Sequence, residues 1–214
     1  MNIELEQEII DLYHIENKKE KKDKILDIIK KVDRIDDVEN HEKYYLKGYL
    51  WYLIPFDSET RNKEIVTNLK KSLLVNKEYL FAKAYLGYFF FDQKQYQKVI
   101  ETLDDLDFSY FEERDQLWRS LKLQELLCVS KLNLKKEISN SLYDKILNLI
   151  FLYSSVPEEE IVIPNELIES VLNNSHKEGA FKLVNQIDTL INSENQKDYF
   201  DDEVKKEVKR KLKK

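Results

Sequence analysis

The sequence is poor in the residues that make tight turns and covalent cross-links. Its 214 residues include three glycines, three prolines and one cysteine. An all-β or α/β fold needs many tight turns, which glycine and proline supply, so their scarcity argues against both classes. The single cysteine, Cys128, excludes an intramolecular disulfide, and nothing in the sequence indicates an oxidising compartment.

Long apolar runs and an excess of positive charge are also missing. No run approaches the roughly 18 uncharged apolar residues that a membrane span requires. The N-terminal stretch MNIELEQEII lacks the positive charge and the longer apolar core of a secretory signal. A net charge of −6 argues against general nucleic-acid binding and is compatible with a basic partner. We therefore expect a cytoplasmic protein that binds neither membrane nor nucleic acid.

Long amphipathic segments make up most of the chain. They are rich in leucine, isoleucine, lysine and glutamate, with apolar residues recurring at spacings of three and four, which is typical of helices. This pattern predicts an all-α fold. The expected helices cover residues 2–15, 18–35, 41–54, 59–75, 79–91, 96–106, 108–131, 135–153, 165–173, 179–191 and 198 onward.

The stretch from Lys70 to Leu106 gives the clearest information on architecture. Residues 79–91 are almost all apolar or aromatic, a polar turn follows at residues 92–95, and residues 96–106 form a second amphipathic run. A helix that is apolar all round needs neighbours on more than one side. Stacked antiparallel helical hairpins supply such neighbours.

Two segments share a pattern that resembles the tetratricopeptide repeat. In one copy Leu86-Gly87-x-x-Phe90 precedes Val99-x-x-x-Leu103, and in the other Tyr44-x-x-Lys47-Gly48-x-x-Trp51 precedes Ile65-x-x-x-Leu69. The two glycines are 39 residues apart (87 − 48), against about 34 in this repeat type. In such repeats the glycine lets the two helices of a hairpin approach closely.

A third copy begins at Trp118-x-x-Leu121, where Lys122 replaces the glycine and Glu125 the tyrosine. The resemblance implies an α-solenoid with additional C-terminal helices. We expect a repeat region at residues 1–153, a linker or packed loop at residues 154–164, where prolines bracket an acidic triplet, and a C-terminal helical cap at residues 165–214. A generic stack of helical hairpins is the competing interpretation.

The resemblance also implies which side chains bind a partner. In tetratricopeptide-like stacks the first helix of each repeat lines a concave face. Tyrosine combines apolar area with a hydroxyl group and is common in protein interfaces. Carried onto this sequence, the partner-binding residues are Tyr45, Tyr49, Tyr52, Phe81, Tyr88, Phe91, Asp92, Arg119, Leu123 and Leu126. Packing between helices is the alternative role for each ring.

The residues that carry chemistry do not form a recognisable set. His14, His41 and His176 are far apart and have no second ligand at helical spacing, so no metal site is predicted. Cys128 lies among apolar residues, where a buried, inert thiol is expected. Three scattered glycines do not make a phosphate-binding loop. We expect no catalytic site and no cofactor.

These observations predict a non-enzymatic protein-binding module. A small acidic protein of this kind fits an immunity or antitoxin-type protein that neutralises a partner toxin, and it fits an adaptor almost as well. A helical enzyme or small-molecule sensor, with a pocket between the repeats and the C-terminal helices, is the alternative. RNA binding through aromatic stacking and lysines is a third hypothesis. The sequence does not indicate an oligomeric state.

Overall fold

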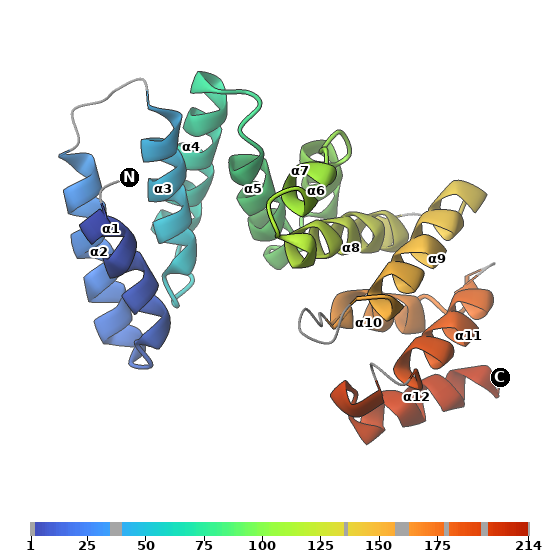
Figure 1. Cartoon of the computed structure of the whole chain (residues 1–214). Helices are drawn as coiled ribbons and strands as arrows, with labels where there is room; N and C mark the ends of the chain where they lie inside the picture. The colour runs from blue at the N-terminus through green and yellow to red at the C-terminus, as the bar shows by residue number, and fades with distance from the viewer. Residues whose placement is uncertain are drawn as a thin grey trace. The chain divides into compact units, whose positions relative to one another are not determined.

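The structure is a computed structural model that describes residues 3–34, 40–134, 137–156, 163–177, 180–193 and 197–213. These residues form helices, turns and irregular connections without a strand, which confirms the all-α prediction for the part of the chain described (Figure 1). The chain divides into two compact units, Met1–Phe89 and Phe90–Lys214, and the boundary falls within one helix. Each unit is described by itself.

The first unit contains paired helices. A short 3₁₀ helix, Leu12–His14, lies between the first two of them. The elements are α1 (Ile3–Asp11), α2 (Lys18–Asp33), α3 (His41–Leu53), α4 (Glu59–Val75) and the larger part of α5 (Leu80–Asp92). The core consists mainly of apolar side chains from α1, the 3₁₀ helix, α2 and α3, among which Leu12, Ile25, Ile28 and Leu50 are fully buried.

Three of these helices begin at polar residues that accept hydrogen bonds from the first turn. The side-chain oxygen of Asn17 accepts from the amides of the first turn of α2, Asn40 does so for α3, and Ser58 for α4. Such caps satisfy amide groups that lack a partner within the helix. The caps at Asn40 and Ser58 stand directly before the helices predicted at residues 41–54 and 59–75. Residues 35–39 lie outside the described part of the chain.

Gly48 is the point of closest approach between α3 and α4. A Cβ atom added to Gly48 would lie 2.6 Å from Leu69 Cγ and 3.2 Å from the Leu69 backbone nitrogen. Leu69 is fully buried. Because real Cβ atoms do not come this close to other atoms, only glycine permits the observed spacing of this hairpin. This confirms the close approach expected at Gly48.

The second unit contains the remaining helices. They are the end of α5, α6 (Tyr96–Leu103), α7 (Ser109–Glu112), α8 (Leu117–Leu134), α9 (Asn140–Ser154), α10 (Asn165–Asn173), α11 (Ala180–Ile191) and α12 (Asp202–Leu212). A 3₁₀ helix, Lys197–Tyr199, precedes α12. Of the linker expected at residues 154–164, residues 157–162 lie outside the described part of the chain.

The prediction of a single helix at residues 108–131 is wrong, because the chain turns between α7 and α8. Asp115 has a φ of 55°, the left-handed conformation. The amide of Gln116 donates a hydrogen bond to the carbonyl of Phe111, and the amide of Asp115 donates one to the carbonyl of Glu112. These two bonds form the Schellman motif that ends many helices. Glycine usually occupies the left-handed position, so an aspartate there gave no signal in the sequence.

The same motif ends α5 in the predicted turn at residues 92–95. Lys94 has a φ of 54°, the amide of Gln95 bonds the carbonyl of Phe90, and the amide of Lys94 bonds that of Phe91. In a chain with three glycines, lysine and aspartate thus occupy two left-handed positions, at some cost in free energy.

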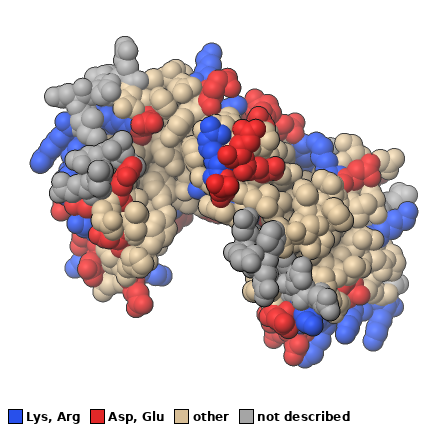
Figure 2. Space-filling model, viewed as in Figure 1, with Lys and Arg blue, Asp and Glu red and all other residues tan. Residues whose placement is uncertain are grey.

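One core joins α8 and α9 to the C-terminal helices. It includes Leu121, Ile146, Leu167, Ile187 and Val208, one from each of α8, α9, α10, α11 and α12. Val204, Val208 and Leu212 recur every four residues along α12 and pack in or against this core. Acidic residues occupy the first turn of α12 and basic residues its last turn. Both placements interact favourably with the helix dipole. Acidic and basic residues are visible at this end of the chain in Figure 2.

Candidate functional site

Aromatic rings from α3 and α5 meet in the first unit. On α3, His41, Tyr45, Tyr49 and Tyr52 follow one another at spacings of four, four and three, which places them on one face of the helix. On α5, Phe81, Tyr85 and Tyr88 do the same. We call Tyr45, Tyr49, Tyr52, Phe81, Tyr85 and Tyr88 the tyrosine ladder.

Tyr85 is the centre of this ladder. Its ring centroid lies 5.8 Å from that of Tyr45, 4.9 Å from Tyr49, 5.6 Å from Tyr52 and 5.5 Å from Tyr88. Most of these pairs are edge-to-face, the arrangement that the charge distribution of aromatic rings favours. The ladder is therefore a continuous contact between two helices.

Further aromatic residues extend the ladder at both ends. Tyr79 lies 5.2 Å from Tyr45 and 4.5 Å from His41, measured between ring centroids. At the other side, the hydroxyl groups of Tyr13 and Tyr49 share a hydrogen bond. Burial and this bond raise the pKa of Tyr49. Tyr13 itself is 60% exposed, so the hydroxyl chain reaches the surface.

The rings of the ladder are only partly covered. Tyr49 is buried, whereas Tyr45, Tyr52, Phe81, Tyr85 and Tyr88 keep part of their surface exposed. Cations lie beside aromatic rings at its margins, with the Arg61 guanidinium 5.8 Å from the Tyr52 ring and the Lys21 ammonium 5.7 Å from Tyr13. The ladder thus presents a strip of partly exposed residues, in which the hydroxyl oxygen of Tyr88 is itself buried.

Five of the sequence-predicted partner-binding residues lie in this ladder. They are Tyr45, Tyr49, Tyr52, Phe81 and Tyr88. Sequence reasoning missed Tyr85, although its spacing from Phe81 and Tyr88 was available as a signal. The other predicted residues, Phe91, Asp92, Arg119, Leu123 and Leu126, belong to the second unit, where Leu123 has no exposed surface and Leu126 is buried. Arg119 is also buried there, and its guanidinium lies 4.6 Å from the Trp118 ring.

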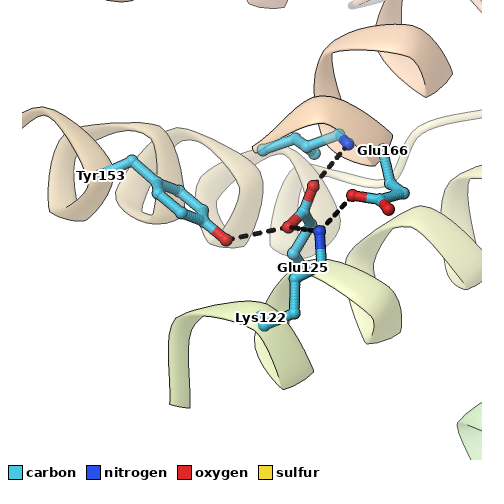
Figure 3. A network of polar contacts seen from close by, with 5 residues as sticks. Lys122, Glu125, Tyr153 and Glu166 are labelled. Carbon is cyan, nitrogen blue, oxygen red and sulfur yellow. Dashed lines mark hydrogen bonds and ion pairs between the residues drawn. The ribbon is translucent and has the colours of Figure 1, made fainter. Parts of the chain in front are cut away.

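The second unit contains a buried carboxylate, Glu125, on α8 (Figure 3). One carboxylate oxygen accepts a hydrogen bond of 2.8 Å from the backbone amide of Leu167 in the first turn of α10. The other accepts from the Tyr153 hydroxyl of α9 at 2.9 Å and from the Lys122 ammonium at 3.0 Å. Lys122 also pairs with Glu166 of α10. This polar network joins three helices.

The ionisable groups of the network differ in the direction in which their pKa values are shifted. Burial raises the pKa of Glu125 to about 7, since the attraction of Lys122 offsets only part of the desolvation. Partial burial also opposes charge on Lys122 and Glu166. For Lys122 the attraction of Glu125 and the contact with Glu166 outweigh burial, and for Glu166 the contact with Lys122 does so. The pKa of Lys122 is therefore raised and that of Glu166 is lowered. Glu125 is the member whose charge changes near neutral pH.

A hollow of about 440 Å³ lies beside this network within the second unit. Its charged lining consists of three carboxylates, Asp92, Glu166 and Glu169, and one ammonium, Lys94. The rings of Phe91 and Tyr96, whose centroids are 5.8 Å apart, also line it. His176 is not among its lining residues. Another hollow, of about 640 Å³, lies between α9 and α11 and includes Phe151, which is 66% exposed.

The described ranges also bear on metal binding, membrane insertion and thiol reactivity. Among these residues no group of three His, Cys, Asp or Glu side chains is placed to hold a metal ion. In the same ranges no helix has both the length and the apolar character to cross a membrane. Burial raises the pKa of the Cys128 thiol to about 11, so it is mostly protonated at neutral pH.

Comparison of the chain with models of known protein families, with curated proteins and with solved structures finds no match.

Proposed function

We propose that this protein is a non-enzymatic protein-binding module whose partner contacts the tyrosine ladder of α3 and α5. The observation that carries this proposal is the ladder itself, in which several partly exposed tyrosines lie next to one another. Tyrosine is enriched among the residues that dominate binding energy, because a rigid ring with a hydroxyl group gives much contact area at little entropic cost.

The arrangement of the first unit supports a repeat of the tetratricopeptide kind. The contact between Gly48 and Leu69 is the close approach that such a hairpin requires. Corresponding faces of α3 and α5, the first helices of two consecutive hairpins in this reading, meet through their aromatic rings. A solenoid built in this way presents its first helices to a partner.

The net charge of −6 favours a basic partner. Within the binding class, the most concrete function is that of an immunity or antitoxin-type protein that neutralises a basic toxin or effector, with an adaptor as the close relative of this role. Binding of this kind should weaken as ionic strength rises.

Site-specific photocrosslinking tests this proposal. A photoreactive phenylalanine analogue is placed at Tyr52 or Tyr88 and, as matched controls, at the exposed Phe151 and Tyr199 of the second unit. The proposal predicts that one protein from the native cell is crosslinked at both ladder positions and at neither control. Crosslinks that form equally at all four positions, or at none, would contradict it.

The acidic hollow supports a second candidate, a sensor of small organic cations. Three carboxylates, of which Glu166 is paired with Lys122, two aromatic rings and the ammonium of Lys94 line a volume that falls within the usual range for ligand sites, and the carboxylates outnumber the ammonium. Titration with spermidine, followed by NMR, tests this candidate. This candidate predicts that the NMR signals of Tyr96 and Glu169 shift when spermidine is added, and that the shift at Tyr96 is lost in the Glu169→Gln variant. Unchanged spectra of the wild type would exclude the candidate.

A further inference from the structure

We propose that a proton on Glu125 controls how firmly α10 is held against α8 and α9. The proposal concerns the second unit and is independent of the tyrosine ladder. It starts from a geometric fact: one buried carboxyl group contacts two neighbouring helices at once (Figure 3).

The first turn of α10 depends on Glu125 for its hydrogen bonding. Pro164 precedes this helix and supplies no side-chain acceptor, so the amide of Leu167 has no cap from its own segment. The Glu125 carboxylate of α8 takes that role at 2.8 Å. The helix dipole and this hydrogen bond favour the ionised carboxylate, and they offset part of the cost of its burial. Separation of α10 from α8 would break this bond.

Release of α10 would also expose Glu125 to water. In the docked state its side chain is fully buried. Three groups face it: Lys122 from its own helix, Tyr153 from α9 and Glu166 from α10. The Lys122 ammonium is shared between two carboxylates, so it neutralises Glu125 only in part. The cost of removing a carboxylate from water is therefore not fully offset.

The sign of the pH effect follows from this balance. The docked state raises the pKa of Glu125 from 4.5 to about 7, whereas a hydrated Glu125 returns to its ordinary value. Between these values the docked state holds a proton that the released state loses. Docking of α10 is therefore favoured at low pH, weakens as the pH rises through this window, and becomes constant above about pH 7.

The neighbouring groups do not titrate in this window. The pKa of Lys122 is raised above 10.5 and that of Glu166 is lowered below 4.5, so both stay charged. With Glu125 alone changing charge, the equilibrium constant for release of α10 should increase roughly 20-fold between about pH 5.5 and about pH 7.5.

Native-state hydrogen exchange on the full chain tests the proposal. The protection of the amides from Leu167 to Leu172, corrected for intrinsic exchange, should fall roughly 20-fold across this pH range. The amides of α9 from Ile146 to Ile150 report unfolding of the whole unit, which also hydrates Glu125, so their protection should have the same pH dependence but remain higher than that of α10 at each pH. Equal protection of α9 and α10 across the pH range would show that only global unfolding occurs and would overturn the proposal.

Two variants assign the effect to Glu125. Glu125→Gln keeps the shape of the side chain without its charge and should abolish the pH dependence in α10. Glu203→Gln, at an exposed carboxyl of α12 in the same unit, should behave as the wild type. A slope that persists in Glu125→Gln would overturn the proposal. Should that variant fail to fold, Tyr153→Phe removes one donor to the carboxylate and should move the midpoint to higher pH, and an unchanged midpoint would be equally decisive.

Discussion

Replacement of Gly48 by alanine should force α3 and α4 apart. The added methyl carbon would lie 2.6 Å from Leu69 Cγ, 2.7 Å from Leu69 Cδ2 and 3.2 Å from the Leu69 backbone nitrogen. Rotation of the leucine side chain relieves the first two contacts only in part, because Leu69 has no exposed surface into which it can move. The third contact involves the backbone of α4, so the helix itself must shift.

The expected magnitude is a balance of two effects. Alanine is favoured over glycine in a helix interior by about 1 kcal/mol. Overpacking of a filled core costs about 1–3 kcal/mol. Since backbone movement is required, we expect the overpacking to exceed the gain, with a net loss of about 1–2 kcal/mol in the free energy of unfolding. Urea unfolding followed by far-UV circular dichroism measures this change.

A double-mutant cycle with Leu69→Ala identifies the cause. Leu69→Ala alone should cost about 2–5 kcal/mol, but in the Gly48→Ala background the cost should be at least about 1 kcal/mol smaller, because the clash is removed and the new methyl group fills part of the cavity. The control Thr67→Ala, at an exposed position of α4, should give only a small gain. If Gly48→Ala stabilises the protein and the two effects are additive, the reasoning about this hairpin is refuted.

Three further changes test the local structure. Lys94→Gly should stabilise the protein by about 1 kcal/mol, because glycine adopts the left-handed conformation of residue 94 without strain, and thermal unfolding that shows no gain would contradict this. Ser58→Ala should cost about 1 kcal/mol in urea unfolding through loss of the α4 cap, whereas an unchanged midpoint would mean that this bond contributes nothing. Cys128 should react with a thiol reagent at mildly alkaline pH only when denaturant is added, since burial raises its pKa to about 11, and rapid labelling of the native protein would disprove that burial.

The helical architecture was predictable because its signals are local. Apolar spacing and the caps at Asn40 and Ser58 are properties of a few neighbouring residues, and the structure has helices where these signals occur. The turn at Asp115 escaped prediction for a physical reason. Its Schellman motif depends on a left-handed aspartate, and aspartate in the sequence does not indicate that conformation.

The aromatic face was predicted in part from the helical period. Tyr45, Tyr49 and Tyr52 share one face of α3, and the repeat resemblance pointed to that face. Tyr85 was not predicted because the repeat resemblance points to Tyr88, the residue after Gly87. The spacing from Phe81 to Tyr85 to Tyr88 nevertheless follows one helix face. Which ring edges are covered depends on packing between helices, which the sequence does not contain.

The Glu125 network could not be predicted from the sequence. Lys122 and Glu125 stood out in the sequence as departures from the repeat pattern, at the positions of the glycine and the tyrosine. The structure brings both into one polar network with Tyr153 and Glu166, which follow 28 and 41 residues after Glu125 (153 − 125 and 166 − 125). A departure from a repeat marks a position with a different role, but its partners come from distant segments.

The central claim is that the tyrosine ladder binds a protein partner. The most direct test is the affinity of the crosslinked partner, once purified, for the wild type, for Tyr52→Ala, for Tyr88→Ala and for the control Phe151→Ala, measured by calorimetry on variants whose fold is verified by circular dichroism. The account predicts that at least one ladder variant loses about 2 kcal/mol of binding free energy, roughly a 30-fold weaker affinity, while Phe151→Ala is unchanged. Equal affinity of all four proteins for the partner would contradict it.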